Sequence, residues 1–223
     1  GIFDNIRKSV YFLLSCNLGE VMAVFVSMLI WHTSPLLPIQ LLWINLVTDS
    51  LPALALGVEP AEYDIMKRKP RPKNEGIFSG GMGIVCALQG VMFCAITVVA
   101  YLLGRTHFFS GGDDPVMGQT MGFAVLAFSQ LFHAFNARSR HSLFRIGLFS
   151  NLRMLGAFAV SALIMLAALL IPPLQTLFGL TALPFDEWEW ILGLSLSPIV
   201  VVELSKFGIW IYRKCRGKKK HDE

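Results

Sequence analysis

Oxygen-bearing side chains interrupt the first two apolar runs of the sequence. Asn45, Thr48 and Asp49 are separated by three and four residues, a spacing that places them on one face of a helix. Asn17 and Glu20, three residues apart, interrupt the run before it. A charged side chain at the centre of a membrane helix costs about 2.5–3.5 kcal/mol on insertion scales, so such residues mark functional sites. Carboxylate, amide and hydroxyl oxygens bind hard cations, and these five side chains predict a cation site inside a membrane.

The link between the two apolar runs is short, since it consists essentially of residues 32–35. We therefore expect the runs to form antiparallel neighbouring helices. Glu20 lies 11 residues before Trp31, and Asp49 lies 11 residues after Pro38. Both carboxylates are thus expected near the middle of the membrane, where the two polar faces can meet.

Pro52 follows the second polar group and disturbs its helix. Proline has no backbone N–H, and its ring clashes with a carbonyl one turn back, so we expect a kink or unwinding over residues 48–50. Irregular backbone is tolerated at that depth only where it is buried in protein or lines a cavity. Two alternatives to a cation site stay open. Asn17 alone could be a hydrogen-bonding residue between helices, and Glu20 and Asp49 could share a proton and bind no ion.

The composition is that of a membrane protein. Of the 223 residues, 54% are hydrophobic and 15% are charged, whereas soluble domains carry about 25% charged residues. There is no signal-peptide pattern and the chain starts at Gly1, so we expect it to be part of a longer protein. Apolar stretches long enough to cross about 30 Å of hydrocarbon recur along the chain. They predict an all-α polytopic membrane protein, a bundle of six transmembrane helices at residues 9–31, 36–57, 79–103, 116–136, 153–171 and 188–212.

Basic residues are biased to one side of this predicted bundle. With six spans both termini lie on one side, together with the connections 58–78 and 137–152. Arg105 is the only Lys or Arg in a predicted loop on the opposite side. The positive-inside rule therefore predicts that both termini and those two connections are cytoplasmic. We attribute the net charge of +4 to contact with anionic lipid headgroups, and not to nucleic-acid binding.

The polar segments resemble a known family of ion pumps. NLGEV, QLLWINLVTDSLPALALG and the following VEPAEYDIMKRKPR resemble the fifth and sixth membrane helices of P-type Ca²⁺-transporting ATPases and their loop. The six spans fit helices five to ten, so the resemblance covers essentially the whole chain. Sodium- and proton-type relatives tend to carry Pro at the position of Gly19 or Asp at that of Asn45, so the motif favours Ca²⁺. The resemblance implies a first ion held by Asn17, Glu20, Thr48 and Asp49, and a second by Asn45 and Asp49.

One ligand implied by the resemblance is changed. In the sarcoplasmic-reticulum type the eighth helix supplies a Glu, and VLAFSQLFHAFNARS places Gln130 there. A glutamine can donate its carbonyl oxygen, but it removes one negative charge. Glu20 and Asp49 carry a formal charge of −2, which neutralises one Ca²⁺, and a second ion would depend on a fourth-helix carboxylate outside this sequence. We therefore expect one transported Ca²⁺ rather than two, with helix packing as the alternative role of Gln130.

Three further patterns concern the ends of the spans. Residues 58–78 are either a solvated basic connection or, by the resemblance, a cytoplasmic coupling loop that contacts the phosphorylation domain. Asp114 before Pro115 predicts a helix cap. Glu203 and Lys206, three residues apart, predict an ion pair near the cytoplasmic end of the last span.

Small residues and cysteines are expected to serve packing. Gly80, Gly81 and Gly83, at the start of the third span, are small residues that permit a close approach of helices. Cys86 and Cys94 lie eight residues apart, and none of the four cysteines forms a CxxC pattern, so neither zinc nor disulfides are predicted. The fifth predicted span is almost without polar residues and is interpreted as scaffold.

We interpret the chain as the C-terminal membrane half of a P-type ATPase that exports Ca²⁺, with proton counter-transport. It contains neither a DKTG phosphorylation sequence nor a Gly-rich nucleotide loop, so we expect no catalytic residue in it and no ATP hydrolysis by it alone. ATP and Mg²⁺ would bind missing cytoplasmic domains, which are the expected partners together with the remaining helices and lipid. The short loops favour a bacterial plasma (inner) membrane. A free-standing six-helix cation channel or carrier and a non-transporting membrane assembly module remain alternatives.

Overall fold

The protein's structure is a computed structural model that describes residues 2–59, 76, 81–106, 112–138 and 151–219, with side chains described as far as residue 208. These residues form helices and contain no strand. The elements are α1 (Ile2–Trp31), α2 (Pro38–Ile44), η1 (Asn45–Asp49), α3 (Ser50–Gly57), α4 (Met82–Thr106), α5 (Pro115–Ala137), α7 (Leu152–Leu170), α8 (Pro172–Phe178) and α9 (Phe185–Lys219).

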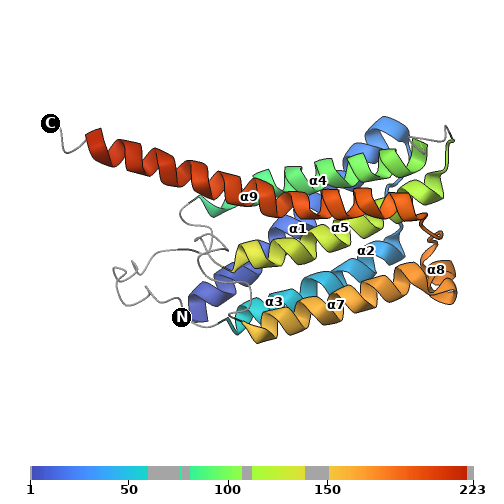
Figure 1. The fold of residues 1–223 in the computed structure, drawn as a ribbon, viewed down its shortest axis with the longest axis horizontal. Helices are drawn as coiled ribbons and strands as arrows, with labels where there is room; N and C mark the ends of the chain where they lie inside the picture. Colours follow the sequence, from blue (N-terminus) through green and yellow to red (C-terminus); the bar gives the residue numbers. More distant parts are fainter. Residues whose placement is uncertain (1, 60–75, 77–80, 107–111, 139–150, 220–223) are drawn as a thin grey trace.

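The long helices run up and down as antiparallel passes of one bundle (Figure 1). The second pass consists of α2, η1 and α3 in line, while α8 lies at the end of the bundle between α7 and α9. The start of α1 and the far end of α9 point to the same end of the bundle. The antiparallel arrangement of the first two passes, expected from their short link, is therefore confirmed.

In the described part of the chain, five helical stretches are long and apolar enough to cross a membrane, namely Ile2–Trp31, Pro38–Gly57, Met82–Thr106, Leu152–Leu170 and Phe185–Gly208. Large apolar side chains such as Leu42, Leu54 and Leu163 lie exposed on the outside of the bundle, where lipid chains would cover them. The all-α polytopic membrane fold is thus confirmed. The helix that corresponds to the predicted fourth span, α5, is not among the five, and most of its residues are buried by the other helices. A count of six spans therefore stays a prediction.

Glycines bring α4 into close contact with its neighbours on both sides. A Cβ atom on Gly19 of α1 would lie 2.4 Å from Phe93 Cβ, and one on Gly90 would lie 2.8 Å from Leu18 Cγ. On the α5 side, a Cβ on Gly104 would lie 2.9 Å from the backbone oxygen of Met117.

The close approach expected at these glycines is not found at Gly81 or Gly83, and Gly80 lies outside the described residues. A Cβ added at either glycine meets no described atom within 4 Å. Gly81 instead has φ of +79°, a left-handed conformation that glycine adopts readily at the start of α4. The close contacts lie further along α4, at positions that the spacing of small residues did not single out.

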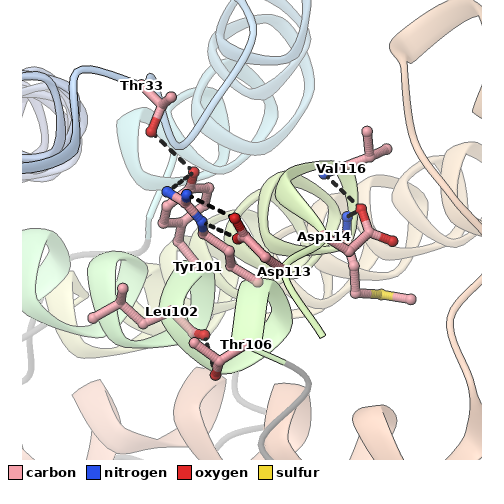
Figure 2. Close-up of polar contacts among 9 residues, drawn as sticks. Thr33, Tyr101, Leu102, Thr106, Asp113, Asp114 and Val116 are labelled. Atoms are coloured by element: carbon pink, nitrogen blue, oxygen red, sulfur yellow. Dashed lines mark hydrogen bonds and ion pairs between the residues drawn. The ribbon is translucent and has the colours of Figure 1, made fainter. Parts of the chain in front are cut away.

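Polar contacts hold the ends of α4 and α5 together on one side of the bundle (Figure 2). Arg105 donates to both carboxylate oxygens of Asp113, at 2.5 and 3.2 Å, and Tyr101 Oη lies 3.1 Å from Thr33 Oγ1. The Arg105 guanidinium lowers the pKa of Asp113. Asp114 Oδ1 accepts from the backbone N–H groups of residues 116 and 117, so the cap predicted before Pro115 is confirmed.

Candidate cation site

The second pass is broken at its centre by a π-helical turn. Its five residues, Asn45–Asp49, follow α2 directly and lead into α3, whose third residue is Pro52. Proline supplies no N–H to the preceding turn, which favours a wider turn at this point. Two hydroxyls satisfy carbonyls of the turn: Ser50 Oγ donates to Asn45 O at 2.9 Å, and Ser161 Oγ of α7 donates to Val47 O at 3.0 Å. The predicted irregularity of the helix before Pro52 is therefore confirmed.

Glu20 projects from α1 into the bundle and is 4% exposed. Its Oε2 accepts from Asn45 Nδ2 at 2.9 Å, and its Oε1 accepts from Gln130 Nε2 of α5 at 2.8 Å. The hydroxyl of Thr48 donates to Gln130 Oε1 at 3.3 Å and to the backbone oxygen of Ile44 at 2.8 Å. One carboxylate thus connects α1, the π-helical turn and α5.

Asp49 is the second buried carboxylate, at 1% exposed. Its Oδ2 accepts from Asn17 Nδ2 at 3.4 Å, and the same nitrogen donates to Leu13 O at 2.8 Å. Its Oδ1 is buried and has no hydrogen-bond partner among the residues that the structure describes. Because an unpartnered buried oxygen costs about 1–3 kcal/mol, a group that offers positive charge would be favoured there.

The structure therefore connects all six predicted site residues through side-chain hydrogen bonds, in two sets. Asn45, Glu20, Gln130 and Thr48 form one set, and Asn17 and Asp49 form the other. Asn45 donates to Glu20 and not to Asp49, and the joint binding of a second ion by Asn45 and Asp49 stays a prediction.

A family model described as Cation transporting ATPase, C-terminus matches residues 33–208 of the chain, which include the π-helical turn and Gln130. The chain belongs to this family. Residues 33–208 include four of the predicted spans and most of a fifth, and they leave α1 upstream of the match.

Three curated relatives match most of the chain. The chain is 42% identical to Calcium-transporting ATPase 1 of Bacillus cereus, over 92% of this chain and 24% of that protein. It is 39% identical to a Calcium-transporting ATPase of Bacillus subtilis, over 88% of this chain and 22% of that protein. It is 31% identical to Calcium-transporting ATPase 3, endoplasmic reticulum-type, of Arabidopsis thaliana, over 92% of this chain and 23% of that protein. The chain thus spans about a quarter of the length of these relatives, as expected for a part of a longer protein.

The site of this cation-transporting ATPase region offers oxygen ligands of three kinds. Glu20 and Asp49 provide four carboxylate oxygens, the amides of Asn17, Asn45 and Gln130 each carry a carbonyl oxygen, and Thr48 contributes a hydroxyl. Among the described residues no group of three or more His, Cys, Asp or Glu side chains could hold a metal ion. An ion at this site would therefore depend on amide and hydroxyl oxygens in addition to the two carboxylates, which suits a hard cation.

Two residues near the site have roles that the sequence did not indicate. Ser161 is the polar residue through which the predicted scaffold span contacts the π-helical turn, and its only signal was a lone Ser in an apolar run. His133 is buried against the rings of Tyr11, Phe12 and Phe93. Its ring nitrogens have no hydrogen-bond partner in the described part of the chain, so packing is its visible role.

Proposed function

We propose that this chain is the membrane part of an ATP-driven Ca²⁺ pump and that Glu20 and Asp49 bind the transported ion. The observation that carries the proposal is the burial of both carboxylates beside the π-helical turn, with amides from α1, η1 and α5 around them. Ionised carboxylates are costly to bury unless an opposite charge or hydrogen bonds compensate them. The calcium-transporting relatives support Ca²⁺ as the ion.

Asn17, Asn45, Thr48 and Gln130 complete the proposed ligand set. Each amide would turn its carbonyl oxygen to the ion, while the hydroxyl of Thr48 would present a lone pair. When the ion leaves, protons would replace its charge on Glu20 and Asp49, which is the basis of the proposed proton counter-transport. The two carboxylates supply a charge of −2, so we propose that one Ca²⁺ is transported in each cycle.

The remaining parts of the proposed pump lie outside this chain. ATP and Mg²⁺ would act in cytoplasmic domains, and both ends of this chain would face the cytoplasm of a bacterium, across its plasma (inner) membrane. The predicted coupling loop at residues 58–78 would transmit the movement of those domains. Apart from residues 58, 59 and 76, this loop lies outside the described residues, as does most of the basic connection 137–152.

Ca²⁺ uptake tests the proposal in the full-length protein that carries this chain. Inside-out vesicles would be given ATP and radioactive Ca²⁺, and the rate of Ca²⁺ uptake would be compared between Asp49→Asn and wild type. Asp113→Asn is the matched control, because it removes an exposed aspartate at the outer end of the bundle. We expect uptake to be abolished by the first substitution and retained with the second. ATP-dependent uptake by Asp49→Asn at the wild-type rate would refute the proposal, and uptake without ATP would favour a channel.

The number of ions is tested separately by equilibrium binding. Ca²⁺ bound per phosphorylated enzyme should be close to one in wild type, and Gln130→Ala should weaken the binding because it removes a ligand oxygen. A ratio near two in wild type would contradict the single-ion proposal while leaving the pump proposal intact.

A further inference from the structure

A buried ion pair lies at the end of the second pass, away from the cation site. Glu59 follows α3, and Arg138 is the residue directly after α5. Arg138 Nε and Nη2 both donate to Glu59 Oε1, at 3.0 and 2.8 Å. The Arg138 side chain is 1% exposed and that of Glu59 is 8% exposed, so the pair is shielded from solvent.

Hydrogen bonds from two asparagines connect this ion pair to further helices. Asn151 Nδ2 donates to Glu59 Oε2, and Asn151 Oδ1 caps α7 by accepting from the N–H groups of Arg153 and Met154. Asn5 Nδ2 of α1 donates to the backbone oxygens of Glu59, at 2.7 Å, and of Gly57, at 3.2 Å. Glu59 thus connects the end of α3 to α1, α5 and α7. We call Glu59, Arg138, Asn151 and Asn5 the Glu59 clamp.

A buried ion pair is a poor source of stability, because the desolvation of both charges offsets their attraction. Its best-attested effect is to fix one register among several, since the charges are satisfied in one arrangement only. Both carboxylate oxygens of Glu59 are used, and three of its neighbours come from different helices. The geometry of the Glu59 clamp is therefore suited to setting the position of α3.

The position of α3 bears directly on the cation site. Its eight residues span about 12 Å at 1.5 Å per residue, and they connect the clamp to Asp49, the last residue of the π-helical turn. Ser9 Oγ of α1 donates to Ala53 O at 2.9 Å and supports α3 between these two points. A π-helical turn holds one more residue than an α-helical turn, so a shift of α3 by one residue would convert the turn and redirect Thr48 and Asp49.

We propose that Glu59 is a positioning residue for cation binding, and that the Glu59 clamp holds α3 in the register that directs Thr48 and Asp49 into the site. This inference rests on the proposed function of Glu20 and Asp49. Glu59 acts through α3 and takes no part in binding the ion. Residues that orient metal ligands from outside the site change metal affinity by about 10–100-fold when they are replaced.

The test uses a double substitution in the full-length protein, because Glu59→Gln alone would leave Arg138 buried with no carboxylate. Glu59→Gln with Arg138→Met removes both charges and breaks the link from α3 to α5, while Asn5 can still donate to the backbone oxygen of residue 59. Glu203→Gln with Lys206→Met is the matched control, since it removes another part-buried ion pair, at 3.1 Å, from α9. The measurements are Tm and the Ca²⁺ concentration that gives half-maximal phosphorylation by ATP.

We expect the clamp variant to keep a Tm close to that of wild type and to need about 10-fold more Ca²⁺ for half-maximal phosphorylation, with the maximal level unchanged. The control pair should show wild-type Ca²⁺ dependence. Wild-type Ca²⁺ dependence in the clamp variant, or an equal change in the control, overturns the proposal. Asp49→Asn distinguishes a failure of the proposed cation site from a failure of the Glu59 clamp. If this variant is phosphorylated with wild-type Ca²⁺ dependence, the proposed function of Asp49 is refuted. If its Ca²⁺ dependence is changed, a negative result for the clamp variant refutes only the positioning role of Glu59.

Discussion

Replacing Gly19 by alanine would place a methyl group where α1 and α4 are already in contact. The new Cβ would lie 2.4 Å from Phe93 Cβ, and a rotamer change cannot move a Cβ atom, so one of the helices must shift. Overpacking of this kind costs about 1–3 kcal/mol, and this contact belongs at the upper end of that range. Alanine regains about 1 kcal/mol of helix propensity over glycine, which leaves a net loss of about 1–2 kcal/mol.

The matched control is Gly83→Ala, also in a helix, because its Cβ would meet no described atom within 4 Å. A loss of about 1–2 kcal/mol lowers the Tm of a chain of this size by about 2–8 °C, whereas Gly83→Ala should leave the Tm unchanged or raise it. Thermal unfolding of both variants in the same detergent makes the comparison. Since Gly19 precedes Glu20, we also expect weaker Ca²⁺ binding by Gly19→Ala. A Tm for Gly19→Ala at or above that of Gly83→Ala would refute this account of the α1–α4 contact.

Two further predictions concern single contacts. Ser161→Ala leaves Val47 O without its buried donor, so we expect a loss of about 1–2 kcal/mol in thermal unfolding, whereas an unchanged Tm would mean that the bond contributes nothing. Arg105 lowers the pKa of Asp113, so this pair stabilises the fold above the unfolded pKa of aspartate and is lost as pH falls through the folded one. The Tm difference between wild type and Asp113→Asn should therefore shrink as pH is lowered from 6 to 3, and a constant difference would contradict this.

Local patterns in the sequence were sufficient to find the second pass and its irregular centre. Asn45, Thr48 and Asp49 stand out because an apolar helix has no other reason to carry them, and Pro52 predicts the disturbance beside them. The kind of disturbance was not predictable, because a kink, an unwound segment and a π-helical turn all relieve the missing N–H. Ser161, which donates to a carbonyl of this turn, comes from a helix more than a hundred residues later.

The partners of Gln130 and Glu59 show where reasoning from sequence stops. Gln130 was placed near Glu20 only through the resemblance to the Ca²⁺-transporting pumps, since nothing local distinguishes it from a packing residue. Glu59 and Arg138 are 79 residues apart and lie in the predicted connections 58–78 and 137–152, where charged residues are ordinarily solvated. Periodicity identifies which face of a helix is polar, but it does not say which helix will lie against that face. The same limit explains why the glycines that pack closely along α4 were not identified.

The close glycine contacts along α4 also restrict how this bundle can move. A methyl group would not fit between α4 and either α1 or α5 at these glycines, so the three helices are closely packed there. The second pass is different, since it is tied at both extremities, by Gln40 Nε2 to Phe178 O at 3.0 Å and by Glu59 to Arg138. Contacts at both ends allow the second pass to rotate about its own axis, but they oppose its translation along that axis. A movement of the second pass would then be a rotation of the π-helical turn between its two anchored ends.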